Sequence, residues 1–257
     1  MRDELAVPIP LLYGFLLTLA RVGGALVFVP LPGIRSGPES VRAVLAVGLT
    51  LALFSRWSAP PVSSPGIGEL AGWLLTEAAI GLAIGLAVSF ITEGFLLAAQ
   101  ILSLQAGFSY ASTVDPTTKA DSTVLVVIAQ LLAGLLFLAT DLDRQVFLAF
   151  ARSLETFPPG SALASPALAD KLIPLGAGIF STGLRLVLPV VILLVMVDIA
   201  LALLGRLNAH LQLLTLAFPI KILAGLGLLA WILVLFPRVF NQSAEHTLAG
   251  LHILIAR

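Results

Sequence analysis

The chain is a succession of long apolar runs separated by short polar or proline-rich connectors. The runs cover residues 7–29, 41–54, 69–93, 94–114, 123–140, 172–204 and 211–236, and they predict an all-α protein of about six or seven long helices. A shorter amphipathic helix is expected at 144–156, inside a polar connector at 141–171, and the tail 237–257 keeps some helical spacing. The 172–204 run is expected to bend near Pro189. Since about 20 apolar residues cross a bilayer, most runs can span a membrane, whereas 41–54 is marginal.

The stretch 94–122 has an unusual mixture of apolar and polar residues. Its first 21 residues form the longest charge-free run of the chain, yet this run contains glutamine, serine and threonine. Helical spacing puts small or hydrogen-bonding residues on one stripe, namely Ala99, Gln100, Ser103, Ala106, Gly107 and Tyr110. Such a stripe favours a closely packed helix or a lumen over acyl chains. The helix is expected to break at Asp115-Pro116, so we predict a hairpin with a polar inner face and a polar tip.

Composition indicates an integral membrane protein or a protein that lies inside an apolar assembly, and we predict one domain over residues 1–257. The hydrophobic share is 59%, the charged share is 11%, and the mean hydropathy is +1.07. Ordinary soluble domains are about 45–50% apolar and about 25% charged. The 14 basic and 14 acidic residues cancel without forming a basic block, so we expect no nucleic-acid partner. Asp3 and Glu4 precede the first run, which predicts a retained helix rather than a signal peptide.

Several apolar runs contain charges that lipid would disfavour. Glu77, Arg185, Asp198 and Lys221 lie in or near such runs. At about 2.5–3.5 kcal/mol per charge at mid-bilayer, four charges facing lipid would cost roughly 10–14 kcal/mol. Either these side chains face protein or water, or the helices that carry them lie outside the hydrocarbon of the bilayer. For Asp198, ion coupling and pairing with Arg206 or Lys221 are both open.

A ridge of small residues lies between two carboxylates. Glu77, Gly81, Gly85, Ser89 and Glu93 repeat every four residues and include a GxxxG match. The ridge predicts either a tight contact between subunits or ordinary packing within one chain. We assign Glu77, Gly81, Gly85, Ser89, Gln100 and Gln105 to subunit packing.

Catalytic patterns are missing from the sequence. The three histidines include no pair at the i, i+4 spacing of helical zinc ligands, and cysteine is absent. No Gly-x-Ser-x-Gly elbow or phosphate-binding loop occurs. Asp141 and Asp143 stand at a helix start, where capping is the expected role. We predict that the protein is no enzyme and has no cofactor or metal site.

A set of motifs in fixed order then identifies a family. These motifs are Ala20-Arg21-Val22-Gly23-Gly24 with Pro30 and Val41-Arg42; Gly81, Gly85, Gln100, Gln105-Ala106-Gly107-Phe108 and Asp115-Pro116; and Leu188-Pro189-Val190, Arg206 and Phe218-Pro219-Ile220-Lys221-Ile222. Over about 220 residues they resemble the FliR family, an export-gate component of flagellar type III secretion. Two departures are Asp141-Leu142-Asp143-Arg144, where a glycine and histidines are expected, and Asn208-Ala209-His210, which lacks the usual proline.

The resemblance implies a structural role. Family members resemble a fusion of FliP and FliQ and pack with them as helical hairpins in a hetero-oligomeric, channel-forming gate. Expected partners are FliP-like and FliQ-like subunits, other inner-membrane export-apparatus proteins, exported polypeptides in transit, and membrane lipid. The expected location is the bacterial inner membrane, as a multi-pass protein of the flagellar basal body. The loop after the glutamine-glycine-phenylalanine motif contributes to the pore plug, which here implies Gly107, Phe108, Ser109, Tyr110, Asp115, Pro116 and Lys119.

Other interpretations stay open from the sequence. The injectisome homologue shares the pattern, so a virulence system is an alternative to the flagellum. A stand-alone ion-coupled transporter using Asp198 and Lys221 is the alternative from another class. Phe108 and Tyr110 could also be plain core aromatics. Arg185, Asp198, Arg206 and Lys221 are predicted to be buried charges.

Overall fold

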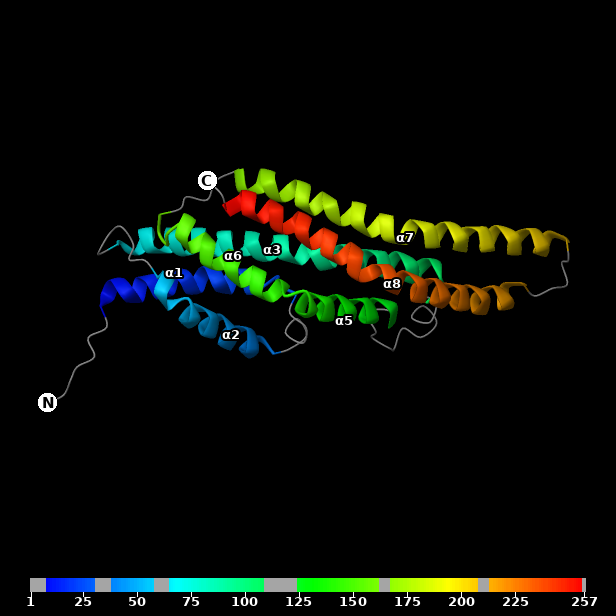
Figure 1. The fold of residues 1–257 in the computed structure, drawn as a ribbon, viewed down its shortest axis with the longest axis horizontal. Helices are drawn as coiled ribbons and strands as arrows, with labels where there is room; N and C mark the ends of the chain where they lie inside the picture. The colour runs from blue at the N-terminus through cyan, green and yellow to red at the C-terminus, as the bar shows by residue number, and fades with distance from the viewer. Residues whose placement is uncertain are drawn as a thin grey trace. The chain divides into compact units, whose positions relative to one another are not determined.

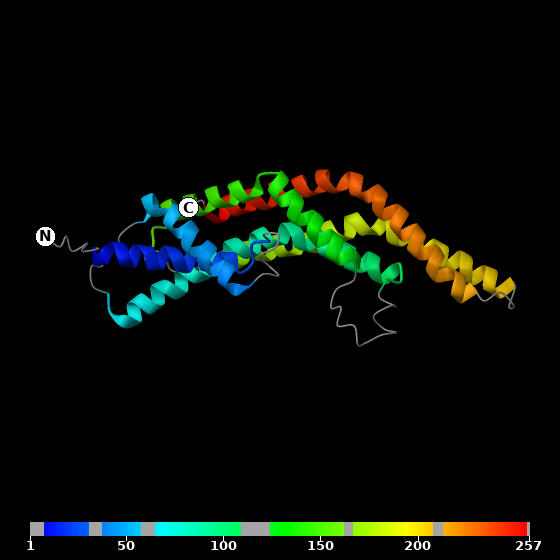
Figure 2. The ribbon, with the colours of Figure 1, turned by 90° about the horizontal axis from the view of Figure 1, so that it is seen from below.

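The computed structural model describes residues 8–30, 38–57, 65–108, 124–161, 167–207 and 213–255. The described residues form helices joined by short turns and contain no strand, which confirms the all-α expectation. Figures 1 and 2 show the helices α1 (Ile9–Leu26), α2 (Glu39–Ala52), α3 (Ile67–Gln105), α5 (Val124–Ala139), α6 (Leu142–Thr156), α7 (Ala167–Leu207) and α8 (Leu213–Ile255), with a short 3-10 helix, η1 (Phe54–Arg56), after α2.

Three helices of the described chain are long and apolar enough to cross a membrane. They are α1, α3 and the Ile173–Arg206 part of α7. Helices α5 and α6 pass the same test only together, as a pair bent at a short break. The membrane class is therefore confirmed, but the count of six or seven long apolar helices is not. Part of the difference is that some runs treated as separate belong to one helix.

Helix α3 joins two of the predicted runs. The expected boundary at residues 93–94 is wrong, because α3 continues for 39 residues, and Figure 1 shows it as one ribbon. A single carboxylate at Glu93 has no helix-breaking effect. The helix then ends at Gln105, well before the break expected at Asp115-Pro116, which lies outside the described residues.

Glycine explains the early end of α3. Gly107 has φ 84°, a left-handed conformation that glycine adopts without steric cost. The Phe108 N–H donates to the Ser103 carbonyl at 3.0 Å, and the Gly107 N–H donates to the Leu104 carbonyl at 3.2 Å. These two bonds form a Schellman motif, which satisfies the last helical carbonyls. Within the described residues, α3 therefore carries the predicted stripe as far as this turn, and Tyr110 lies outside them.

Helices α7 and α8 are both longer than the sequence predicted. Helix α7 has 41 residues and begins inside the expected connector at 141–171. Helix α8 has 43 residues and continues past the expected end at residue 236, with Pro219 and Pro237 inside it. An internal proline removes one backbone hydrogen bond and usually kinks a helix. The bend near Pro189 stays a prediction.

The chain divides into two compact units. Unit 1 comprises residues 1–90, 137–176 and 244–257, and unit 2 comprises residues 91–136 and 177–243. Unit 1 contains the contact between α1 and α2. In unit 2, buried residues of α3, α5 and α7 form one core, made of Leu102, Ala106, Leu125, Val187, Val190 and Leu194. The prediction of one domain over 1–257 stays a prediction.

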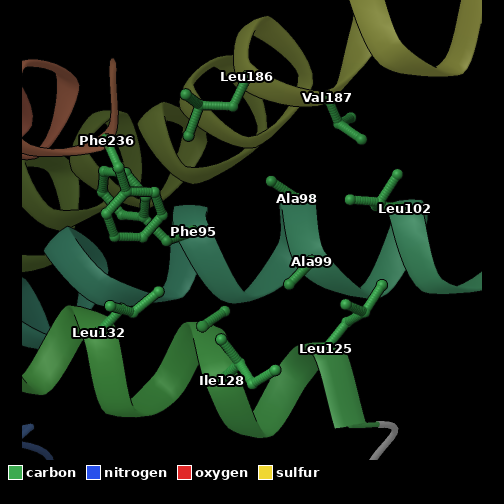
Figure 3. A pocket seen from close by; sticks show the side chains of 11 residues that line it. Phe95, Ala98, Ala99, Leu102, Leu125, Ile128, Leu132, Leu186, Val187 and Phe236 are labelled. Carbon is green, nitrogen blue, oxygen red and sulfur yellow. The ribbon is translucent and has the colours of Figure 1, made fainter. Parts of the chain in front are cut away.

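Unit 2 also contains a small apolar cavity. It has a volume of about 40 Å³, and Figure 3 shows side chains of α3, α5, α7 and α8 around it. The rings of Phe95 and Phe236 lie 4.4 Å apart between their centroids, and Phe95 also contacts Phe240 at 5.3 Å. Because its lining is apolar, the cavity offers no hydrogen-bonding partner that would hold a water molecule.

Candidate functional site

A buried ion pair joins α1 to α3 within unit 1. Arg21 of α1 is 0% exposed and Glu77 of α3 is 1% exposed. The Arg21 Nε donates to Glu77 Oε2 at 2.6 Å, and Nη2 lies at the same distance from that oxygen. A guanidinium offers five donors in a rigid fork, so it can bind other acceptors at the same time.

The remaining guanidinium donors bind the end of α6. Nη1 donates to the Ser153 carbonyl and Nη2 to the Phe157 carbonyl, both at 2.8 Å. Carbonyls at a helix C-terminus carry partial negative charge, so a cation is favourable there. Glu77 Oε1 accepts the Gly160 N–H at 3.0 Å, and Gly160 has φ 80°, which favours glycine. We call this set of Arg21, Glu77, Ser153, Phe157 and Gly160 the arginine clamp.

The small-residue ridge packs against α1 of the same chain. A Cβ at Gly81 would overlap the Arg21 carbonyl oxygen, and one at Gly85 would overlap the Ala25 carbonyl oxygen. From the other side, a Cβ at Gly24 would overlap the Ala78 carbonyl oxygen. Of the two alternatives, contact between subunits and packing within one chain, Gly81 and Gly85 therefore show packing within one chain.

The other residues assigned to subunit packing lie in different surroundings. Glu77 bonds within the chain, in the arginine clamp. Ser89 is buried and donates to the Leu86 carbonyl. Gln100 is exposed, whereas Gln105 is half-buried and contacts Asp198. A role of these side chains toward partner subunits stays a prediction.

A second polar group lies in unit 2. Lys221 of α8 forms an ion pair with Asp198 of α7, and the Gln105 Nε2 at the end of α3 donates to Asp198 Oδ2 at 3.2 Å. The side chains of Lys221 and Asp198 are 17% and 39% exposed. Of the two partners considered for Asp198, the structure pairs it with Lys221. We call these three residues the α7–α8 polar cluster.

Two predicted buried charges are exposed in the chain alone. Arg185 and Arg206, both in α7, are exposed at the surface. Because α7 is apolar around them, burying these charges would require a partner that supplies counter-charges. Their burial therefore stays a prediction about an assembly.

The predicted plug lies mostly outside the described residues, since Ser109, Tyr110, Asp115, Pro116 and Lys119 are not described. Gly107 ends α3, and Phe108 packs against the core of unit 2. Phe108 therefore packs as a core aromatic would, which was the alternative interpretation. A role of Phe108 in a plug stays a prediction.

The start of α6 departs from the capping expected there. Asp141 is the N-cap residue, but its side chain makes no capping hydrogen bond and its φ is 54°. Asp143 lies in the first turn, where a carboxylate interacts favourably with the helix dipole. Within the residues that the structure describes, no group of three or more histidine or acidic side chains could hold a metal ion.

The sequence reasoning did not identify the arginine clamp. A signal was present, because Arg21 is the single charge of the run at 7–29 and needs a partner wherever that run is buried. Glu77 provided the opposite charge in another run. The backbone acceptors on Ser153 and Phe157 carry no comparable sequence signal.

Comparison with known proteins assigns the family. The family model described as "Bacterial export proteins, family 1" matches residues 12–247. The flagellar biosynthetic protein FliR of Escherichia coli (strain K12) is 30% identical over 236 residues, which are 88% of this chain and 90% of that protein. The FliR proteins of Caulobacter vibrioides and Bacillus subtilis are 30% and 27% identical, over 83% and 92% of this chain and 86% and 94% of their own lengths. The chain therefore belongs to the FliR family of bacterial export proteins, which confirms the resemblance inferred from the ordered motifs.

Proposed function

We propose that this chain is a structural, channel-forming subunit of the flagellar type III protein export gate. It is a multi-pass protein of the bacterial inner membrane, at the flagellar basal body, and has no catalytic activity. The observation that carries the proposal is the family match over residues 12–247, together with relatives named as flagellar biosynthetic proteins. Those names favour the flagellum over an injectisome.

An exposed apolar stripe on α7 supports an assembly with other helices. Leu188, Ile192, Met196, Ile199 and Leu203 recur at helical spacing and are 46–62% exposed in the chain alone. Val187, Val190 and Leu194 on another side of the helix are buried in unit 2. Such a stripe needs either lipid or a partner helix to cover it. We propose that FliP-like and FliQ-like subunits cover it.

Tryptophan substitution separates these two coverings. Met196 is 62% exposed, so replacing it changes no core of this chain. A Met196→Trp side chain can lie among acyl chains but would hold a packed partner helix apart. We therefore expect Met196→Trp to reduce co-purification with FliP-like and FliQ-like chains, and Met196→Leu to leave it unchanged. Equal recovery of the partners with both variants would contradict a subunit interface on this stripe.

We also propose that residues 107–119 contribute to the plug of the closed pore. The support is the resemblance to the FliR family, together with the Schellman motif, which ends α3 at Gly107 and already satisfies its last carbonyls. Deletion within residues 109–119 should make cells leaky to ions or small molecules while the partners still co-purify. If the complex assembles and the cells show no added leak, residues 107–119 do not form the plug.

The alternative of a stand-alone ion-coupled transporter is favoured by one observation, the α7–α8 polar cluster. A carboxylate beside an amine in apolar helices is the type of group that couples ions in transporters. Reconstitution distinguishes the two functions. The purified chain alone should move no solute across liposomes if it is a gate subunit, whereas unaided solute uptake that Asp198→Asn abolishes would establish a transporter.

A further inference from the structure

Unit 1 contains an open groove of about 380 Å³. Its walls come from α1, α2, α6 and the end of α5, and they are almost entirely apolar. The lining side chains include Leu26, Val29 and Leu45, with Asp143 and Arg144 as the charged ones. The volume lies in the range of about 300–1,000 Å³ that is typical of small-molecule sites. A slender apolar chain can fill a groove of this volume.

The groove lies at the end of a candidate membrane span. Helix α1 has 18 residues, which at about 1.5 Å per residue is close to the roughly 30 Å of bilayer hydrocarbon. Leu26 is the last residue of α1, and Val29 follows shortly after it. With α1 across a bilayer, the groove would therefore open near the level of the lipid headgroups.

Arg144 gives the groove a cationic group. Its side chain is exposed, and none of the other described residues forms an ion pair with it. By contrast, exposed Arg56 pairs with Glu155. A guanidinium can donate two parallel hydrogen bonds to one phosphate, which a lysine ammonium cannot do in the same geometry.

Asp143 is the neighbouring charge and must be considered with Arg144. It lies in the first turn of α6, where the helix N-terminus carries partial positive charge and offsets a carboxylate. Asp141 makes no capping bond with these first N–H groups. The helix N-terminus therefore partly offsets the Asp143 carboxylate, and this carboxylate forms no ion pair with Arg144.

We propose that this groove binds one acyl chain of an anionic membrane phospholipid, with the headgroup phosphate on Arg144. The apolar walls select the chain, and the guanidinium selects the phosphate and adds a preference for a headgroup with net negative charge. This inference does not depend on the export function, because a lipid site is measured on the purified protein without export.

Native mass spectrometry of the full-length chain tests the proposal. Delipidated protein is incubated with phosphatidylglycerol or with phosphatidylethanolamine, and the retained lipid is counted. We expect one phosphatidylglycerol per chain, bound at least tenfold more tightly than phosphatidylethanolamine. Arg144→Gln should lower phosphatidylglycerol affinity about tenfold, the effect of losing a hydrogen bond between charged groups. Leu45→Trp, which fills the groove, should abolish retention of both lipids.

Controls make each outcome decisive. Arg238→Gln removes an exposed arginine of unit 2, far in sequence from the groove residues, and should leave retention unchanged. Arg144 is exposed, so its substitution should not impair folding. Equal phosphatidylglycerol retention by Arg144→Gln and the wild type would overturn the proposal. It would also be overturned if the wild type held no lipid while Leu45→Trp reduced co-purification of another protein, because the groove would then be a protein contact.

Discussion

Removing either charge of the arginine clamp should destabilise the protein strongly. In Arg21→Met, the Glu77 carboxylate stays 1% exposed and keeps only the Gly160 N–H as a partner. Breaking a buried ion pair by removing one partner costs about 3–5 kcal/mol. For a chain of this size, each kcal/mol lowers the melting temperature by about 2–4 °C. The expected fall is therefore roughly 6–20 °C.

The double variant provides the sharper test. Arg21→Met with Glu77→Met removes both charges and leaves the Gly160 N–H without its acceptor, at a cost of about 1–3 kcal/mol. The Ser153 carbonyl keeps its bond from the Phe157 N–H at 3.0 Å. We therefore expect the double variant to be more stable than Arg21→Met alone. That ordering follows only if the unpaired buried charge, rather than lost packing, is what destabilises the single variant.

The assay is thermal unfolding of the detergent-purified chain, followed by circular dichroism at one scan rate, since membrane proteins often unfold irreversibly. Arg56→Met is the matched control, because its pair with Glu155 is 43% and 53% exposed. An exposed pair contributes about 0–1 kcal/mol, so this variant should change the melting temperature by only a few degrees. A double variant whose loss equals the sum of the two single losses would refute the reasoning.

Three further predictions can be checked by the same melting assay. Gly85→Ala should lower the melting temperature because its Cβ would overlap the backbone of α1, whereas Gly48→Ala, with open space around it, should leave it unchanged or raise it. Leu125→Ala should cost about 2–5 kcal/mol by enlarging the cavity of unit 2, while Leu131→Ala, in the same helix but 60% exposed, should cost little. Asp141→Gly should raise the melting temperature by a few degrees, because glycine adopts φ 54° without strain. An unchanged melting temperature would contradict the close approach of α1 for Gly85→Ala, the packing of Leu125 for Leu125→Ala, and the backbone strain at Asp141 for Asp141→Gly.

The sequence predicted helix positions well where an apolar run had clear ends. The run at 123–140 became α5, and the amphipathic stretch at 144–156 became α6. It failed where two runs met without a strong breaker, as at Glu93 in α3 and at Pro237 in α8. Local signals there are weak, and packing over the whole length of the helix decides whether it continues.

The sites were harder to predict than the helices. Asp198 and Lys221 were expected to need partners, and opposite charge in apolar surroundings was enough to suggest their pairing. The arginine clamp depends on the Ser153 and Phe157 backbone carbonyls, which every residue possesses and no pattern marks. The choice between packing within and between chains at Gly81 depended on which helix approached it. Sequence spacing does not contain that information.

The arginine clamp also has a consequence for biosynthesis. During translation, Glu77 is synthesised 56 residues after Arg21, and the Phe157 carbonyl is synthesised 136 residues after it. At about 5–20 residues per second, the guanidinium spends roughly 3–11 s without its counter-ion and roughly 7–27 s without its last acceptor. During that interval the nascent first helix carries an unneutralised charge. The insertion machinery must therefore shelter α1 from the lipid until much of the chain has been translated.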